Sequence, residues 1–251
     1  MRAGRAGAHL YFFANYLEPN SSACYNLSMT TFSIKEAFKK AWELTKENIL
    51  VLIGLTSIVA VISWILHVWA MGMERSLQEG DISKYTFFIF IYIITLFLSM
   101  LAQIGYIKIL LKIYDGEEIN PRDIFGYHNL LWNFLLQSIL YGLIVIVGFV
   151  LLIIPGIIFI IKYGYASYFV IDQNMKPIDA MKASSRITYG NKWKIALFGI
   201  CILATNILGG LLFVVCLLVT MPLTALASIH IFRILSGTIH AQQKLELDEK
   251  K

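Results

Sequence analysis

A single basic side chain, Lys162, lies near the middle of an apolar stretch of this sequence. A charged group within a bilayer is costly, so such residues usually face a partner or an aqueous cavity. Lys162 therefore predicts a site for an anion or a lipid headgroup. The alternative is structural: in a short segment, its side chain could reach the membrane surface or pair with an acid. Asp172 and Asp115 are the acids considered as partners, and Arg186 is a further candidate for ligand binding or ion pairing.

Sequence patterns that accompany catalysis are missing. The chain has no H-E-x-x-H, no P-loop and no G-x-S-x-G motif. Cys24, Cys201 and Cys216 show no C-x-x-C spacing, and His67 and His230 stand alone, so no metal site is predicted. We therefore expect a protein that is not an enzyme and has no cofactor.

Two further groups of residues predict structure rather than chemistry. Pro155 and Gly156 should end one apolar segment and begin the next, because proline interrupts helical hydrogen bonding. Asn206, Gly209 and Gly210 form a small polar patch of the kind that packs membrane helices together. Substrate binding is the alternative for that patch.

The elements that must position these residues are membrane helices. Of 251 residues, 58% are hydrophobic and 15% charged, whereas a soluble domain has about 25% charged residues. The apolar residues form uninterrupted blocks instead of the alternation of a membrane barrel. We predict an all-α polytopic transmembrane bundle with about six spans. They cover residues 49–71, 85–113, 130–154, 157–171, 195–219 and 223–235, with Pro222 at the last turn.

Basic residues predict how this bundle is oriented. The segments before spans one, three and five, and the end of span six, are rich in Lys and Arg, as cytoplasmic segments are. Both termini should then be cytoplasmic, in the cell (inner) membrane. The net charge of +5 fits this asymmetry. Because no basic soluble module is present, we expect no nucleic-acid partner.

Three regions differ in composition. Residues 1–28 are expected to be a disordered tail or an extension upstream of a natural start at Met29. Residues 29–241 form the transmembrane helical domain, and 242–251 form a charged, frayed tail. Within the domain, amphipathic cytoplasmic helices should precede spans one and five, the first beginning with a capping box at Ser33 and Glu36.

These two amphipathic helices look like copies of each other. Ala37-Phe38-Lys39, Leu44-Thr45 and Asn48 recur at a constant offset of 143 residues. The recurring residues are Ala180-Met181-Lys182, Ile187-Thr188 and Asn191. The first copy carries Phe38 and Trp42, and the second has Met181 and Ser185 at those positions. We therefore expect the first helix to touch lipid and the second to dock on protein.

The second copy also carries a family resemblance. Ile154-Pro155-Gly156-Ile157-Ile158, Lys162, Asp172 and the run 180–193 form one ordered pattern. It resembles a family of polytopic prokaryotic membrane proteins related to the membrane domain of glycerophosphoryl diester phosphodiesterases. The likeness covers roughly residues 33–235. It implies the membrane fold and an anchoring or accessory role, but no activity.

Two hypotheses for function follow. The first is a non-enzymatic scaffold or accessory protein, which would bind membrane lipids and another membrane or cytoplasmic protein. The second is a transporter or lipid-handling protein with an anion or headgroup site near Lys162. The repeat and the Pro155-Gly156 break favour the second hypothesis. The shared orientation of the two copies argues against a transporter built from inverted halves.

Overall fold

The computed structural model describes residues 32–119, 126–212 and 214–249, and all regular structure in these ranges is helical. The predicted extension 1–28 lies outside them. The elements, in chain order, are α3 (Ile34–Glu47), α4 (Ile49–Gln78), α5 (Ile82–Asp115), the 3-10 turn η4 (His128–Leu130), α6 (Leu131–Leu151), α7 (Ile153–Tyr163), α8 (Ala166–Gln173), α9 (Pro177–Ile187), α10 (Lys192–Leu212) and α11 (Val214–Glu249). The predicted all-α class is confirmed.

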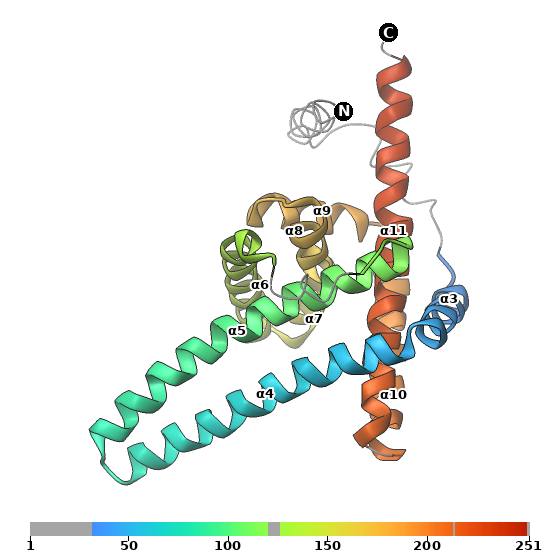
Figure 1. Cartoon of the computed structure of the whole chain (residues 1–251). Coiled ribbons are helices and arrows are strands. Elements are labelled where there is room, and N and C mark those ends of the chain that lie inside the picture. The colour runs from blue at the N-terminus through green and yellow to red at the C-terminus, as the bar shows by residue number, and fades with distance from the viewer. Residues whose placement is uncertain (1–31, 120–125, 213, 250–251) are drawn as a thin grey trace.

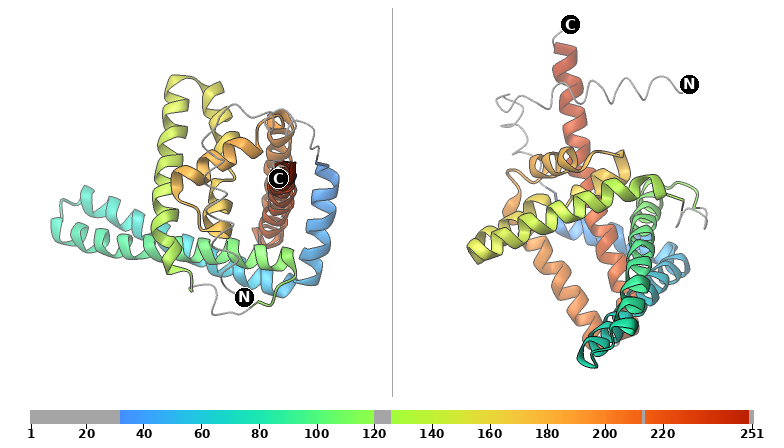
Figure 2. Two further views of the ribbon diagram at one scale, coloured as in Figure 1. Left: turned by 90° about the horizontal axis from the view of Figure 1, so that it is seen from above. Right: turned by 90° about the vertical axis from the view of Figure 1, so that its left-hand side faces the viewer.

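Three helical hairpins extend from a common base (Figure 1). They are α4/α5, α6/α7 and α10 with the first half of α11, and they extend in different directions (Figure 2). The short helices α3, α8 and α9 lie at the base, where α3 packs on α11 and α9 packs on α8 and α6. The base therefore holds the elements together, while the hairpins project from it.

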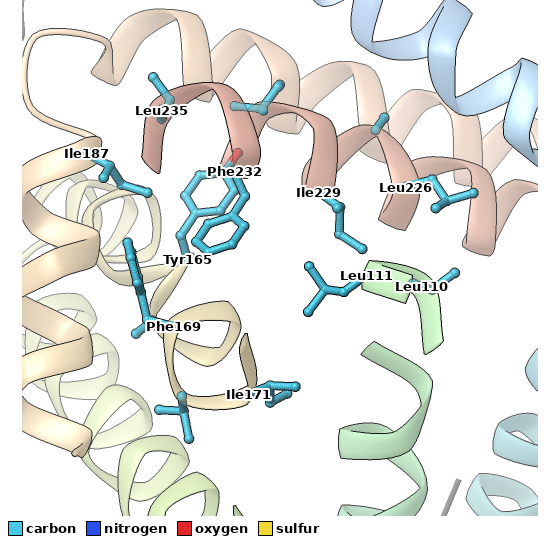
Figure 3. Close-up of a cluster of buried hydrophobic side chains, with 14 of the residues drawn as sticks. Leu110, Leu111, Tyr165, Phe169, Ile171, Ile187, Leu226, Ile229, Phe232 and Leu235 are labelled. Atoms are coloured by element: carbon cyan, nitrogen blue, oxygen red, sulfur yellow. The ribbon is translucent and has the colours of Figure 1, made fainter. Parts of the chain in front are cut away.

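The hydrophobic core occupies the base. Phe232 of α11 stacks on Tyr168, with ring centroids 5.4 Å apart, and meets Phe169 edge-on at 5.0 Å. Figure 3 shows side chains from α5, α8, α9 and α11 converging around this cluster. Most of the exposed large apolar side chains lie on the hairpins instead. Such surfaces need an apolar solvent, which a bilayer supplies.

Among the residues that the structure describes, six helical segments are long and apolar enough to cross a membrane, as predicted. They are Ile49–Gln78, Ile82–Asp115, His128–Leu151, Ile153–Gln173, Lys192–Leu211 and Cys216–Gly237. The chain is thus a helical membrane protein of the predicted class. The fourth segment is composite, because α7 ends at Tyr163 and α8 begins at Ala166.

Several predicted boundaries are wrong. Pro222 lies inside α11 instead of at a turn, and α10 ends at Leu212, before the predicted end of the fifth span. Membrane helices tolerate internal proline because neighbouring groups compensate for the lost hydrogen bond. The break near Pro155 falls at Leu152, so Pro155 and Gly156 belong to the first turns of α7. α11 continues to Glu249, so the predicted frayed tail is largely helical.

The two copies of the repeat share local geometry. Thr45 Oγ1 donates to the carbonyl of Ala41 at 2.7 Å, and Thr188 Oγ1 donates to that of Ser184 at 3.0 Å, both four residues back. Past each copy, the carbonyl of Asn48 or Asn191 accepts from an N–H four residues on, at 3.0 Å in both cases. The offset of 143 thus relates equivalent hydrogen bonds as well as similar residues.

The expected difference between the copies is only partly correct. α9 does dock on protein, through Ala180, Ala183 and Ser184, which are fully buried. However, α3 also docks on protein: its small-residue face packs on α11, and Phe38 meets Phe198 edge-on at 5.9 Å. Trp42 remains 48% exposed. A face with Ala37 and Ala41 allows this close helix contact, and contact of the exposed Trp42 with lipid stays a prediction.

Candidate functional site

Lys162 lines a pocket between α6, α7 and α9, with a volume of about 380 Å³. Its lining combines basic, hydroxyl-bearing and apolar side chains. The lining residues are Leu140, Ile144, Lys162, Tyr163, Ile178, Met181, Lys182, Ser185 and Arg186. The structure therefore brings together Lys162 and Arg186, two of the three predicted ligand or ion-pair candidates.

Helix α9 fixes the backbone at Lys162. Ser184 Oγ donates to the carbonyl of Lys162 at 2.9 Å and accepts from the N–H of Tyr165 at 3.2 Å. Thr188 Oγ1 also lies 3.3 Å from the Lys162 carbonyl. These hydroxyls satisfy backbone groups freed where the chain passes from α7 to α8. An unsatisfied buried backbone group costs about 1–3 kcal/mol, so this arrangement holds Lys162 against α9.

The charged part of the pocket is basic. Lys162, Lys182 and Arg186 all line it, and none of its nine lining residues is acidic. The Lys162 ammonium lies 5.1 Å from the centre of the Tyr163 ring, within cation–π range. Ser185 adds a hydroxyl to the lining. Three cations and a hydroxyl form a donor set that suits a phosphate or carboxylate group.

The remaining walls are apolar. Leu140 and Ile144 lie one turn apart on α6, and Ile178 and Met181 come from α9. Ile178 is exposed, and Ile144 is partly exposed. The pocket thus combines a basic site with an apolar surface that an acyl chain could cover.

Asp172, the third candidate, pairs elsewhere. Its carboxylate receives two hydrogen bonds from Arg233, Nη1 to Oδ2 at 2.6 Å and Nη2 to Oδ1 at 3.0 Å. Arg233 also binds Asp115, with Nε 3.2 Å from Oδ1 and a second bond from Nη2 to Oδ2. Neither acid lines the Lys162 pocket. Both acids considered as partners of Lys162 thus bind Arg233, which joins α5, α8 and α11.

The small polar patch on α10 packs against α11. Asn206 Nδ2 donates to Thr224 Oγ1 at 3.3 Å. A Cβ added to Gly209 would lie 2.7 Å from Thr220 Oγ1, whereas Gly210 faces Leu217 at ordinary contact distance. These contacts favour the packing interpretation of the patch over substrate binding. Gly156 has a comparable role, since its Cβ would lie 2.7 Å from the Phe149 ring.

Metal-type side chains do not gather within the described residues, where no group of three or more His, Cys, Asp or Glu residues could hold an ion. Cys201 and Cys216 are free thiols. His230 instead accepts or donates a hydrogen bond with Tyr114 OH at 2.8 Å.

Comparison with known proteins finds distant relatives. The chain is 25% identical over 237 residues to the uncharacterized protein Rv2560 of Mycobacterium tuberculosis, with 84% of this chain and 71% of the relative covered. The uncharacterized protein Mb2590 of Mycobacterium bovis matches to the same extent. No protein-family profile matches the chain, and no solved structure is similar to it. The chain is thus similar to mycobacterial proteins whose names state no activity.

Proposed function

We propose that this chain is a non-enzymatic protein of the cell (inner) membrane that binds the anionic headgroup of a lipid in the Lys162 pocket. The observation that carries the proposal is the convergence of Lys162, Lys182 and Arg186 in a pocket whose lining has no acid. The shared ligand chemistry is a phosphate or carboxylate group. Lipid handling, or an accessory role that depends on a bound lipid, is the resulting function.

Electrostatics favours an anion here. Three cations line one pocket, and a bound anion would reduce the repulsion between them. The guanidinium of Arg186 can bind a phosphate with two hydrogen bonds, while a lysine supplies a compact charge. The apolar walls then favour an amphiphile over a free ion, because covering apolar surface adds to the binding free energy.

The proposed orientation places this pocket where anionic lipids are found. Basic residues of α3, α9 and the start of α10 lie at the base, on the side that Lys and Arg predict to be cytoplasmic. Anionic headgroups attract basic segments near the membrane surface by roughly 1 kcal/mol for each Lys or Arg. Both termini are proposed to be cytoplasmic as well.

A scaffold function is the alternative, and the resemblance of residues 154–193 to the phosphodiesterase-related membrane domain supports it. The argument that α9 is a docking helix for a protein partner is weaker, because the docking face of α9 is occupied within the chain by Lys162 and Tyr165. A protein partner would therefore need another surface.

The test is thermal unfolding of the detergent-solubilised protein with added lipid. Phosphatidylglycerol should raise the melting temperature of the parent, and phosphatidylcholine should not. A ligand at a hundred times its Kd stabilises by about 2.7 kcal/mol. Lys162→Leu should lose this rise, and Lys162→Arg, which keeps the charge, should retain most of it.

The controls separate the possible outcomes. Lys39→Leu removes an exposed lysine of α3 outside the pocket and should leave the lipid effect unchanged. Inorganic phosphate that stabilises as well as the lipid would identify a free anion as the ligand. An equal rise for the parent and Lys162→Leu with phosphatidylglycerol would contradict the proposal.

A further inference from the structure

The turn between α6 and α7 is apolar throughout. Leu151, Leu152, Ile153 and Ile154 follow one another there, and each is 66–70% exposed. The turn between α4 and α5 is quite different, because Glu79, Asp81 and Lys84 form ion pairs there. Polar residues suit a turn that emerges into water, whereas the α6/α7 turn carries none from Phe149 to Gly156.

Two backbone hydrogen bonds are formed at this turn. The N–H of Leu152 donates to the carbonyl of Gly148 at 3.1 Å, and the carbonyl of Leu152 accepts from Gly156 N–H at 3.4 Å. Pro155 occupies the first turn of α7, where an N–H would lack a helical acceptor, and proline has none. A backbone group without a partner costs several kcal/mol in hydrocarbon, so these two hydrogen bonds and the proline lower the cost of placing the turn in lipid.

The position of α9 limits how far the hairpin can reach. α9 packs on α6 and α7 beside Lys162, and its Lys182 is exposed. Exposed charges favour a position at or outside the headgroup level, and with α9 at that level the hydrocarbon begins on the turn side of Lys162. α7 has 11 residues from Ile153 to Tyr163 and rises about 16 Å. The hydrocarbon core is about 30 Å thick.

We propose that the α6/α7 hairpin does not cross the bilayer. It enters from the side that carries α9, turns at Leu152 near the bilayer midplane, and returns to the same side. Six helical segments have the composition of spans, but the third and fourth then form a half-membrane hairpin. Lys162 lies at the headgroup level in this arrangement instead of at the bilayer centre. The proposal holds whether or not the pocket binds an anion.

The α4/α5 hairpin supplies the internal contrast. Its helices have 30 and 34 residues and rise about 45 and 51 Å, enough to cross the hydrocarbon with tilt. The α4/α5 hairpin also extends in a different direction from α6/α7 (Figure 2), so no single membrane normal is parallel to both hairpins. A hairpin inclined to the membrane normal reaches a smaller depth, and this applies to the shorter α6/α7 hairpin.

Cysteine labelling in sealed membrane vesicles tests the depth of the turn. Leu152→Cys is made in the full chain with Cys24, Cys201 and Cys216 replaced by alanine. A membrane-impermeant maleimide is applied to one face of the vesicles and then to the other. Leu152→Cys should react from neither face, and should react fully after denaturation in detergent. Glu79→Cys and Glu118→Cys are the positive controls for the two faces.

A spin label on Leu152→Cys gives the second measurement. Collisions with oxygen should enhance the relaxation of the label strongly, and collisions with a water-soluble nickel complex should do so weakly. This pattern is expected for a site near the bilayer midplane. Leu152 is 68% exposed, so this chain does not shield it, and a midplane depth of the label would identify lipid as the shield. Labelling from the face that labels Glu79→Cys would overturn the proposal. A spin-label depth at the headgroups would do the same.

Discussion

Arg233 makes charge-assisted hydrogen bonds between distant parts of the chain. It binds Asp115 at the end of α5 and Asp172 in α8, so a single guanidinium connects three helices at the base. The side chains of Arg233 and Asp172 are 25% and 14% exposed. Water screens them only in part, so the contact falls between an exposed pair, at about 0–1 kcal/mol, and a buried one.

Removing Arg233 should destabilise the base. Arg233→Met leaves two carboxylates facing each other without a cation, and breaking a fully buried pair in this way costs about 3–5 kcal/mol. Partial exposure makes a somewhat smaller loss the expectation. The measurement is a thermal melt in detergent, with Arg75→Met on the exposed part of α4 as the control. Combining Arg233→Met with Asp172→Asn should restore part of the loss, and a double variant no better than Arg233→Met would contradict the ion-pair explanation.

The sequence contained a signal for Arg233 that the prediction did not use. A charged residue in the mostly apolar run from Ile229 to Leu235 predicts a partner or an aqueous cavity, as Lys162 does. Because the predicted sixth span ended at Leu235, Arg233 counted only toward the basic end of that span. The role of Ser184 had no such signal. Its partners lie 19 and 22 residues earlier in the chain, and only the fold brings them together.

Among the helices, α6 and α7 make an unusually close contact. A Cβ on Gly148 would lie 2.9 Å from Cα of Gly156 and 2.7 Å from the Phe159 ring. Two glycines thus let the backbones approach where the hairpin turns. Small residues have this role in membrane helix pairs, where close packing replaces the hydrophobic driving force.

Gly148→Ala should therefore separate α6 from α7. Overpacking of this kind costs about 1–3 kcal/mol, and the backbone of Gly156 cannot move aside as a flexible side chain could. Gly142→Ala on the same helix is the matched control, because nothing lies within 4 Å of its Cβ. Alanine favours helix over glycine by about 1 kcal/mol, so this control should be neutral or stabilising. Equal melting of the two variants would exclude the close contact.

Composition and periodicity predicted the helices well and their ends less well. Long apolar blocks identify α4 and α5 because no competing structure fits them. Proline positions were misleading at two places for different reasons. Pro222 continues a helix, while Pro155 lies in the first turn of α7, three residues after the true turn at Leu152. Proline is compatible with both settings in a membrane, so the residue alone does not locate a turn.

At the scale of the whole molecule, the location of the core was not predictable from composition. Apolar residues fill both the base and the hairpins, but most of those that protein covers lie at the base. The amphipathic segments predicted the position of the base better, because α3 and α9 lie there and each precedes a span. The Lys162 pocket depends on the same arrangement. Its cations come from α7 and α9, which the sequence could not place in register.

The charge asymmetry makes a prediction for the whole molecule. Glu79 lies at the outer turn of α4/α5, and Glu118 follows α5 at the base; both are exposed. Basic residues are concentrated at the base, so the positive-inside rule places Glu118 in the cytoplasm and Glu79 outside. In intact cells, a membrane-impermeant maleimide should label Glu79→Cys and not Glu118→Cys, and permeabilisation should expose Glu118→Cys. Because α4 and α5 are long enough to span the bilayer, labelling of both positions in intact cells would reject this topology.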